Sequence, residues 1–354
     1  MEIAEKLLFW YKNNKRDLPW RNTRDPYKIW LSEIILQQTR VEQGLPYYQR
    51  FVNKYPTVID LSLAKEEEIL KLWQGLGYYS RALNLLKAAH QIVEVHNGKF
   101  PNKYVELLTL TGIGPYSAAA IASIAYGEAV PVLDGNVFRV ISRIFALDIA
   151  TDAASNRKIF IKILEELLSN HDPCEFNQAI MEFGALHCVP KNPDCTNCPL
   201  ISNCIGFKKK LVDKLPFKKG KVEVKNIYQY YLFIEDKNGK TLLHKRDKNG
   251  IWKGLFEFPM IETEKKINLK SLLGHPNWLP LLPKDKNFQV ELTEGIKHNL
   301  SHRQILATFV HLKVLRLPKL KKTFIFEIGI NELAKYPVSR LTDKYLKSKG
   351  LVNK

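Results

Sequence analysis

The sequence has little that would tie it to a membrane or to an oxidising compartment. None of its 354 residues falls in a run of the roughly 18 consecutive apolar residues that a membrane-spanning helix needs. Residues 1–20 mix acidic and basic side chains with apolar ones and contain no small-residue cleavage site, so they do not resemble a secretory signal. Five cysteines, an odd number, do not suggest a disulfide framework. We therefore expect a cytoplasmic protein without membrane contact.

The positive charge of the chain is concentrated in its second half. The net charge is +18, but residues 1–206 contain 22 Lys or Arg and 22 Asp or Glu, which leaves 32 against 14 in residues 207–354. This excess fits nucleic-acid binding and equally a lysine-rich, solvated surface. If the first half binds a polyanion, it must do so through local geometry.

Hydrophobic periodicity divides the chain into two folded regions. Residues 1–206 show helical periodicity, residues 207–225 contain eight lysines with few apolar residues, and residues 226–354 include segments with a period of two. We therefore expect a mostly α-helical domain, a lysine-rich linker and an α+β domain. The pattern predicts helices over 26–39, 61–73, 81–95 and 338–347, strands over 227–234, 241–245, 290–292 and 307–315, and a hairpin turn at 236–239.

Four of the five cysteines are crowded together: Cys188, Cys195, Cys198 and Cys204. Four thiolates at this spacing suit one four-ligand metal centre, either zinc or a [4Fe–4S] cluster. The intervals of six and five residues are unusual for zinc, which favours the cluster. Because the run closes the helical region, we expect its role to be structural. Cys174 stands apart and is expected to be a buried free thiol.

A glycine turn joins two predicted helices in the segment 108–118. Gly112 and Gly114 flank one residue, and Pro115 begins a helix of small residues. Backbone N–H groups at such a helix start attract an anion, and glycines let a phosphate come close. A tight turn between packed helices produces the same pattern. A phosphate site of this kind would bind DNA without adding net charge.

Two acidic residues are candidates for acid–base chemistry. Glu33 lies in a predicted helix among large apolar residues, where burial would keep it protonated; a surface salt bridge is the alternative. Asp134 follows the glycine turn by about twenty residues and precedes a helix, so it is either a helix N-cap or a carboxylate presented to a sugar. One acid and one carboxylate are what cleavage of a glycosidic bond through an oxocarbenium-like sugar requires.

The glycine turn, Asp134 and the cysteine run, in this order, resemble the helix-hairpin-helix–Gly-Pro-Asp superfamily of DNA glycosylases. Its iron–sulfur branch contains endonuclease III and the MutY-type adenine glycosylases, and the segments 20–21, 32–39, 74–79 and 133–137 are similar to the MutY type. Lyases of the branch form a Schiff base through a lysine in the second hairpin helix, where this chain has Tyr116. The resemblance implies a monofunctional glycosylase that removes adenine mispaired with 8-oxoguanine or guanine.

The resemblance also implies roles for individual residues. Glu33 would protonate N7 of adenine, and Asp134, supported by Tyr116 and Asn136, would stabilise the oxocarbenium ion. The implied adenine pocket consists of Arg16, Trp20, Arg21 and Gln178. The implied DNA contacts are Gln38, Thr39, Leu76, Tyr78 (as a wedge in the base stack), Gly112 and Gly114. The implied ligands of a [4Fe–4S] cluster are Cys188, Cys195, Cys198 and Cys204.

The second domain resembles a Nudix hydrolase at residues 252–259. The acidic metal-binding cluster of true Nudix hydrolases is missing after Pro259, so we expect it to read the lesion and not to hydrolyse nucleotides. Leu300, Ser301 and His302 are similar to the Phe-Ser-His loop that reads 8-oxoguanine in some members, with Leu in place of Phe.

The implied partner is double-stranded DNA that contains an 8-oxoguanine:A or G:A mispair, bound by a monomer on chromosomal DNA. Two alternatives stay open. One is an endonuclease III-like glycosylase/lyase for oxidised pyrimidines, against which Tyr116 and the extra domain argue. The other is a non-catalytic DNA-binding iron–sulfur protein, in which Glu33 and Asp134 would be structural.

Overall fold

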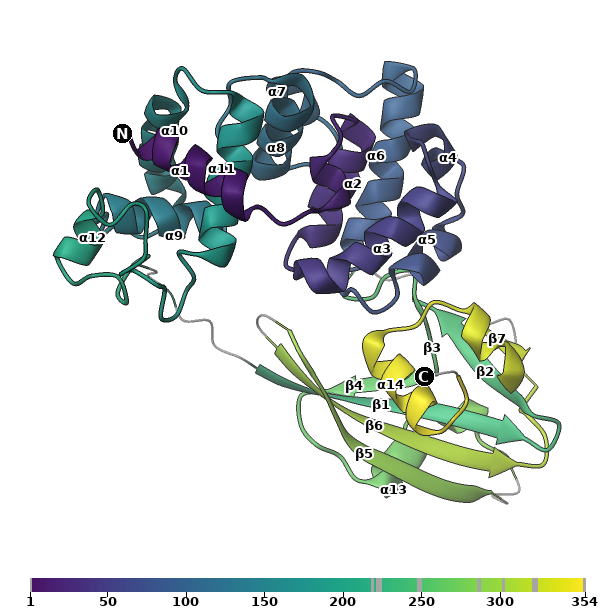
Figure 1. Cartoon of the computed structure of the whole chain (residues 1–354). Coiled ribbons are helices and arrows are strands. Elements are labelled where there is room, and N and C mark those ends of the chain that lie inside the picture. Colours follow the sequence, from purple (N-terminus) through teal and green to yellow (C-terminus); the bar gives the residue numbers. More distant parts are fainter. Residues whose placement is uncertain are drawn as a thin grey trace. The chain divides into compact units, whose positions relative to one another are not determined.

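The chain forms two compact units in the computed structural model (Figure 1), which describes residues 2–217, 220, 225–246, 250–284, 288–300, 303–319 and 324–352. The first unit comprises Met1–Leu63 and Lys87–Lys221, and the second comprises Ala64–Leu86 and Val222–Lys354. Two residues expected to read the lesion, Ser301 and His302, lie outside the described residues. In the described part, each helix is too short or too polar to cross a membrane.

The first unit is built from helices. They are α1 (Ile3–Asn14), α2 (Pro26–Leu36), α3 (Val41–Lys54), α4 (Val58–Ser62), the later part of α6 (Ser80–His96), α7 (Tyr104–Leu107), α8 (Pro115–Tyr126), α9 (Gly135–Ile144), α10 (Arg157–Leu168), α11 (Pro173–Leu186) and α12 (Ile205–Lys208), with single 3-10 turns at Pro19–Arg21 and Ala154–Asn156. Helix α2 packs against α3 and α8, and α11 packs against α1, α8 and α9.

Local signals explain where these helices begin and end. The Asp25 carboxylate accepts a hydrogen bond from the Tyr27 N–H at 2.9 Å, which caps α2 as predicted. The helix ends at Leu36, three residues before the predicted end, because Gln37 is extended and Gln38 has a φ of 55°. The single helix predicted over 61–73 is wrong. The structure has α4 up to Ser62 and α5 (Glu66–Trp73), which begins after an extended Lys65.

Small residues let the central helices of the first unit approach closely. Helix α8 buries Ala118, Ala119 and Ala120 along its length. On α11, a Cβ added to Gly184 would lie 2.7 Å from the Asn136 Cβ, so α9 and α11 nearly touch there. This contact fixes the start of α9, where Asp134 is the N-cap.

The second unit combines α5 and the first part of α6 with two sheets. The strands are β1 (Lys225–Asp236), β2 (Lys240–Lys245), β3 (Phe256–Glu257), β4 (Met260–Thr263), β5 (Gln289–Asn299), β6 (Arg303–Val314) and β7 (Ile325–Gly329), and the further helical segments are α13 (Leu269–Leu273), Leu279–Leu281, Ile330–Lys335 and α14 (Arg340–Ser348). One sheet has the order β4-β1-β6-β5, with β1 and β6 parallel, and the other has the order β3-β2-β7.

The turn at 236–239 is present, but the expected hairpin is not. The Asp236 carboxylate accepts hydrogen bonds from the N–H groups of Asn238 and Lys240 at 2.9 Å, and Gly239 has a φ of 70°. However, β1 and β2 belong to different sheets. Strand β1 pairs with β4 over Tyr228–Tyr231 and with β6 along its whole length, whereas β2 pairs with β3 and β7.

Aromatic stacking fixes the closing helix on the larger sheet. The Phe309 ring of β6 lies between Tyr231 of β1, with centroids 4.8 Å apart, and Tyr345 of α14, with centroids 3.9 Å apart. The Ser339 hydroxyl accepts a hydrogen bond from the Thr342 N–H at 3.1 Å and caps α14. The predicted closing helix is therefore confirmed, starting at Arg340.

Gly184→Ala should destabilise the protein. The new Cβ would lie 2.7 Å from the Asn136 Cβ and 3.1 Å from the Asn136 carbonyl oxygen, so α9 and α11 must separate. We expect the free energy of unfolding to fall by about 1–3 kcal/mol, as for other overpacked sites. Urea unfolding of the full chain measures it. Gly135→Ala, whose Cβ would meet nothing within 4 Å, is the control. Equal stability of wild type and Gly184→Ala would show that this contact is not tight.

Candidate active site

A cavity of about 1100 Å³ opens among α2, α8, α9 and α11, entirely within the first unit. It gathers residues that lie far apart in the sequence. Of the residues predicted for function, those that line it are Arg16, Trp20, Arg21, Glu33, Gln38, Thr39, Gly114, Tyr116, Asp134, Asn136 and Gln178. The cavity thus brings both candidate acids and the implied adenine pocket to one place.

Glu33 is a buried carboxyl that faces this cavity. It lies in α2, where the neighbouring residues Ile34 and Ile35 are also buried, and only 9% of it is exposed. Burial raises the pKa of Glu33 to about 7, with the nearby charge of Asp134 adding to the rise, while the Tyr116 hydroxyl and Arg21 oppose it. A carboxyl with this pKa holds a proton near neutral pH and can donate it.

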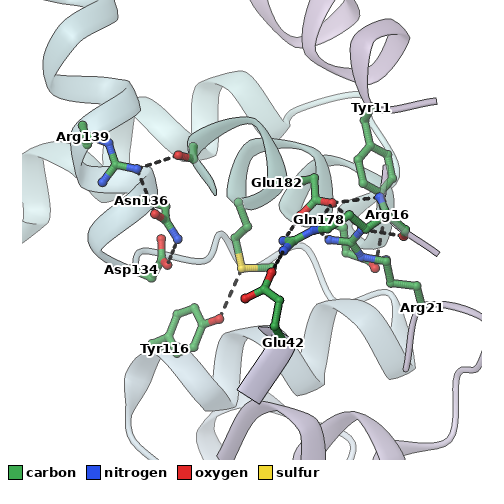
Figure 2. Close-up of polar contacts among 12 residues, drawn as sticks. Tyr11, Arg16, Arg21, Glu42, Tyr116, Asp134, Asn136, Arg139, Gln178 and Glu182 are labelled. Carbon is green, nitrogen blue, oxygen red and sulfur yellow. Dashed lines mark hydrogen bonds and ion pairs between the residues drawn. The ribbon is translucent and has the colours of Figure 1, made fainter. Parts of the chain in front are cut away.

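Asp134 is the N-cap of α9 and also lines the cavity. Its Oδ1 accepts a hydrogen bond from the Val137 N–H at 2.8 Å, which caps α9, and its Oδ2 accepts one from Asn136 Nδ2 at 2.9 Å (Figure 2). Burial raises the pKa of Asp134, and these donors oppose the rise, followed by the Arg139 charge. The same side chain therefore starts the helix and lines the cavity.

Arg139 holds Asn136 in place. Its Nη2 donates to Asn136 Oδ1 at 2.9 Å (Figure 2). The same nitrogen donates to the Gly184 carbonyl at 2.6 Å, and Nε donates to the Cys188 carbonyl at 2.7 Å. Because Arg139 occupies the Asn136 amide oxygen, only the amide nitrogen can face Asp134. Arg139 therefore orients the Asp134 carboxylate through Asn136.

Two arginines of the cavity are bound by one buried carboxylate. Arg16 donates to both oxygens of Glu182, through Nε at 3.0 Å and Nη2 at 2.6 Å, and Arg21 does so at 2.7 and 2.6 Å (Figure 2). Burial alone would raise the pKa of Glu182, but the hydrogen bonds from Arg21 and Arg16 lower it to about 2. This arrangement fixes both guanidinium groups as directional donors.

Gln178 lies one helical turn before Glu182 on α11. Its Oε1 accepts from the Tyr11 hydroxyl at 3.3 Å, and its Nε2 donates to the Cys174 sulfur at 3.1 Å. Trp20 is buried against Tyr48, with ring centroids 5.0 Å apart. Cys174 is a buried free thiol, as predicted.

The glycine hairpin has the predicted backbone. Gly112 has a φ of 79°, and Gly114 is the extended N-cap of α8, with nothing within 4 Å of an added Cβ. The N-terminal N–H groups of α8 therefore face open space at the edge of the cavity.

Three residues predicted to contact DNA belong to the second unit. Leu76 is only 7% exposed, whereas Tyr78 is 50% exposed and has a φ of 48°. The Leu300 N–H donates to the Arg303 carbonyl at 2.7 Å. An exposed ring on a constrained backbone is suited to insertion between bases, which is the role predicted for Tyr78.

The four clustered cysteines line a second, smaller cavity of the first unit. Cys188, Cys195, Cys198 and Cys204 surround it together with apolar side chains and Arg143. Among the described residues, no three His, Cys, Asp or Glu side chains form a group that could hold a metal ion. Burial raises the pKa of Cys198 to about 11, so a thiolate there needs a positive partner.

Sequence reasoning missed two residues that also line the cavity, Glu182 and Arg157. Glu182 could have been found, because it follows Gln178 by four residues on the same helical face. Arg157 starts α10 and donates to the Leu133 carbonyl at 3.4 Å, a contact that no local pattern indicates.

Comparisons with known proteins agree with this architecture. Residues 31–166 match the HhH-GPD superfamily base excision DNA repair protein, and residues 230–348 match the Nudix domain. An adenine DNA glycosylase of Buchnera aphidicola is 38% identical over 266 residues, which cover 75% of this chain and 76% of the relative. The adenine DNA glycosylase of Homo sapiens is 42% identical over 207 residues, 56% of this chain and 38% of the relative.

Among solved structures, a thermostable thymine-DNA glycosylase is 30% identical with a TM-score of 0.54, and the match covers 58% of this chain and 95% of that chain. The fold and the family models thus define a base-excision DNA repair protein of the helix-hairpin-helix superfamily with an added Nudix domain. Within that class, the chain belongs to the adenine DNA glycosylase family. The predicted fold class, a helical domain followed by an α+β Nudix-like domain, is confirmed.

Glu33→Gln should stabilise the protein at alkaline pH. The carboxyl titrates near 4.5 when unfolded and about 7 when folded, so the cost of its ionisation is absent below pH 4.5, grows up to pH 7 and is constant above. At about 1.4 kcal/mol for each pKa unit, the variant should be more stable by about 3 kcal/mol at pH 8. Urea unfolding at pH 5 and pH 8 measures it, with Glu165→Gln on the exposed side of α10 as control. A difference that is larger at pH 5 would contradict the assignment.

Proposed function

We propose that the protein hydrolyses the N-glycosidic bond of adenine mispaired with 8-oxoguanine, and more weakly with guanine, in duplex DNA. The observation that supports this is one cavity with two unlike carboxyls. Glu33 is buried and has a pKa of about 7, while Asp134 accepts hydrogen bonds from Val137 and Asn136. The adenine would enter this cavity by leaving the base stack.

Glu33 is the acid in this mechanism. Adenine is a poor leaving group as an anion, so it must receive a proton as it departs. We assign N7 as the atom that accepts this proton. A large fraction of Glu33 is protonated near pH 7, because burial in the cavity wall disfavours its charged form. As the C–N bond breaks, the proton passes to the base, and the electron pair of that bond stays with adenine.

Asp134 stabilises the sugar that remains. The oxocarbenium ion carries a positive charge, and a carboxylate fixed below it lowers the energy of the transition state. Asn136 orients this carboxylate at 2.9 Å, and Tyr116 stands beside Glu33, its hydroxyl donating to the Met181 sulfur at 3.3 Å. Water then adds to the sugar, which releases a proton and leaves an abasic site.

We assign the remaining contacts as the resemblance implies. Arg16, Trp20, Arg21 and Gln178 would bind the adenine. Gln38, Thr39, Leu76 and Tyr78 would contact the opposite base and the stack. The hairpin at Gly112 and Gly114 would bind backbone phosphate through the N-terminal N–H groups of α8.

We propose that the enzyme is monofunctional. A lyase needs an amine that attacks the sugar, and the corresponding position holds Tyr116. Burial raises the pKa of Tyr116 well above its ordinary value, so its phenol stays protonated and is a weak nucleophile.

We assign a [4Fe–4S] cluster to Cys188, Cys195, Cys198 and Cys204, which line one apolar cavity. When bound, the cluster would cross-link the segment after α11 and supply positive iron to the thiolates.

In the second unit, we assign the reading of 8-oxoguanine to Leu300, Ser301 and His302, without nucleotide hydrolysis. We further propose that a monomer acts on chromosomal DNA in the cytoplasm, with residues 1–206, 207–225 and 226–354 as catalytic domain, linker and recognition domain.

Asp134→Asn should bind mispaired duplex but release adenine at least about 100-fold more slowly. Asparagine retains the N-cap and removes only the charge that stabilises the sugar cation. The assay is release of free adenine from an 8-oxoguanine:A duplex under single turnover, with an 8-oxoguanine:C duplex as substrate control.

In the same assay, Glu33→Gln should lose activity by about 10²–10⁴-fold, because it cannot donate the proton. Glu165→Gln should retain wild-type rates, and near-normal turnover of Glu33→Gln would remove Glu33 from the mechanism.

Borohydride should not trap a covalent complex between the wild-type protein and 8-oxoguanine:A DNA. Trapping reports a Schiff base, which requires an amine nucleophile, and Tyr116 offers none. An endonuclease III-type lyase on a duplex with an oxidised pyrimidine is the positive control. Efficient trapping together with strand cleavage would favour the glycosylase/lyase alternative instead.

A further inference from the structure

Arg143, near the end of α9, is a buried cation that the glycosylase mechanism does not use. It is 2% exposed, and it is among the largest fully buried side chains of the described residues. The acceptors of its guanidinium hydrogen bonds are four carbonyl oxygens and one sulfur. A guanidinium removed from water is stabilised by a nearby negative charge in addition to carbonyl acceptors. The candidates for that charge are the cysteines of the cavity that Arg143 lines.

The guanidinium joins the two ends of the cysteine-bearing segment. Nη1 donates to the Cys188 sulfur at 3.4 Å and to the Val189 carbonyl at 2.8 Å, and Nη2 donates to the Pro190 carbonyl at 3.1 Å. Nε donates to the carbonyls of Val212 and Leu215 at 3.0 and 3.1 Å. One planar group therefore closes a loop that begins with the first clustered cysteine and ends beyond the fourth.

The backbone of Arg143 contacts the fourth cysteine. The Cys204 sulfur lies 3.4 Å from the Arg143 carbonyl oxygen. Two residues later, a Cβ on Gly206 would lie 2.4 Å from the same oxygen, so only glycine lets α12 approach α9 this closely. The first and fourth cysteines of the run are thus both positioned by a single residue.

We propose that Arg143 positions the iron–sulfur cluster and tunes it: its N–H donates to the Cys188 thiolate, its charge offsets the negative cluster, and its carbonyl contacts hold the ligand segment in the binding conformation. This rests on the cluster assigned above. Hydrogen bonds to ligand sulfurs and nearby positive charge favour the reduced form of such clusters. Arg143 is therefore a positioning residue with an electronic effect, which packing alone would not produce.

The test compares three full-length variants with wild type. Arg143→Lys keeps the charge but loses the planar fork, Arg143→Gln loses both, and Lys208→Gln removes an exposed charge of the same segment that donates to the Ser202 carbonyl at 2.6 Å. The readouts are iron and sulfide per chain, the rate of iron loss to a chelator, and the reduction potential of the cluster by voltammetry.

We expect both Arg143 variants to lose iron about tenfold faster than wild type or more, as for other residues behind metal ligands. Arg143→Gln should also have the more negative potential, and Lys208→Gln should match wild type in every readout. If Arg143→Gln does not fold, Arg143→Lys decides the matter. Wild-type iron retention and potential in Arg143→Lys, or in a folded Arg143→Gln, would overturn the inference. Wild-type protein without iron and sulfide would instead overturn the cluster itself.

Discussion

The raised pKa of Glu33 depends on keeping water away from its carboxyl. Glu33 lies in α2, a helix buried on most of its surface because α3 and α8 pack against it. The alanines of α8 let that packing be close, so the carboxyl can meet solvent only through the cavity. Its proton is therefore retained by the fold and not by a partner residue. An aromatic base that enters the cavity would displace water and raise the pKa of Glu33 further.

Helix α9 connects this chemistry with the cysteine segment. Asp134 caps its first turn, Arg139 in its middle donates to both Asn136 and the Cys188 carbonyl, and Arg143 near its end meets the Cys188 sulfur. Ten helical residues span only about 15 Å. The Asp134 carboxylate at the cavity and the cysteine segment thus both contact one rigid helix.

Structural features that depend on neighbouring residues could be predicted from the sequence. Contacts between segments that are far apart along the chain could not. The Asp25 cap, the Gly112–Gly114 hairpin and the closing helix follow from local rules, and the structure contains them. The pairing of β2 with β7 could not be foreseen, because the two strands are far apart along the chain. Arg143 was missed for the same reason: its acceptors lie between 45 and 72 residues away along the chain.

Two acids of the cavity show that burial alone does not set a pKa. Glu182 is 1% exposed and Glu33 is 9% exposed, yet the pKa of Glu182 is lowered to about 2, while that of Glu33 is raised to about 7. The difference is the partners: two guanidinium groups bind Glu182 through both oxygens. By holding Arg16 and Arg21, Glu182 also neutralises cations that would otherwise favour ionised Glu33. Glu182 therefore stays ionised near neutral pH and holds both arginines, while Glu33 keeps its raised pKa.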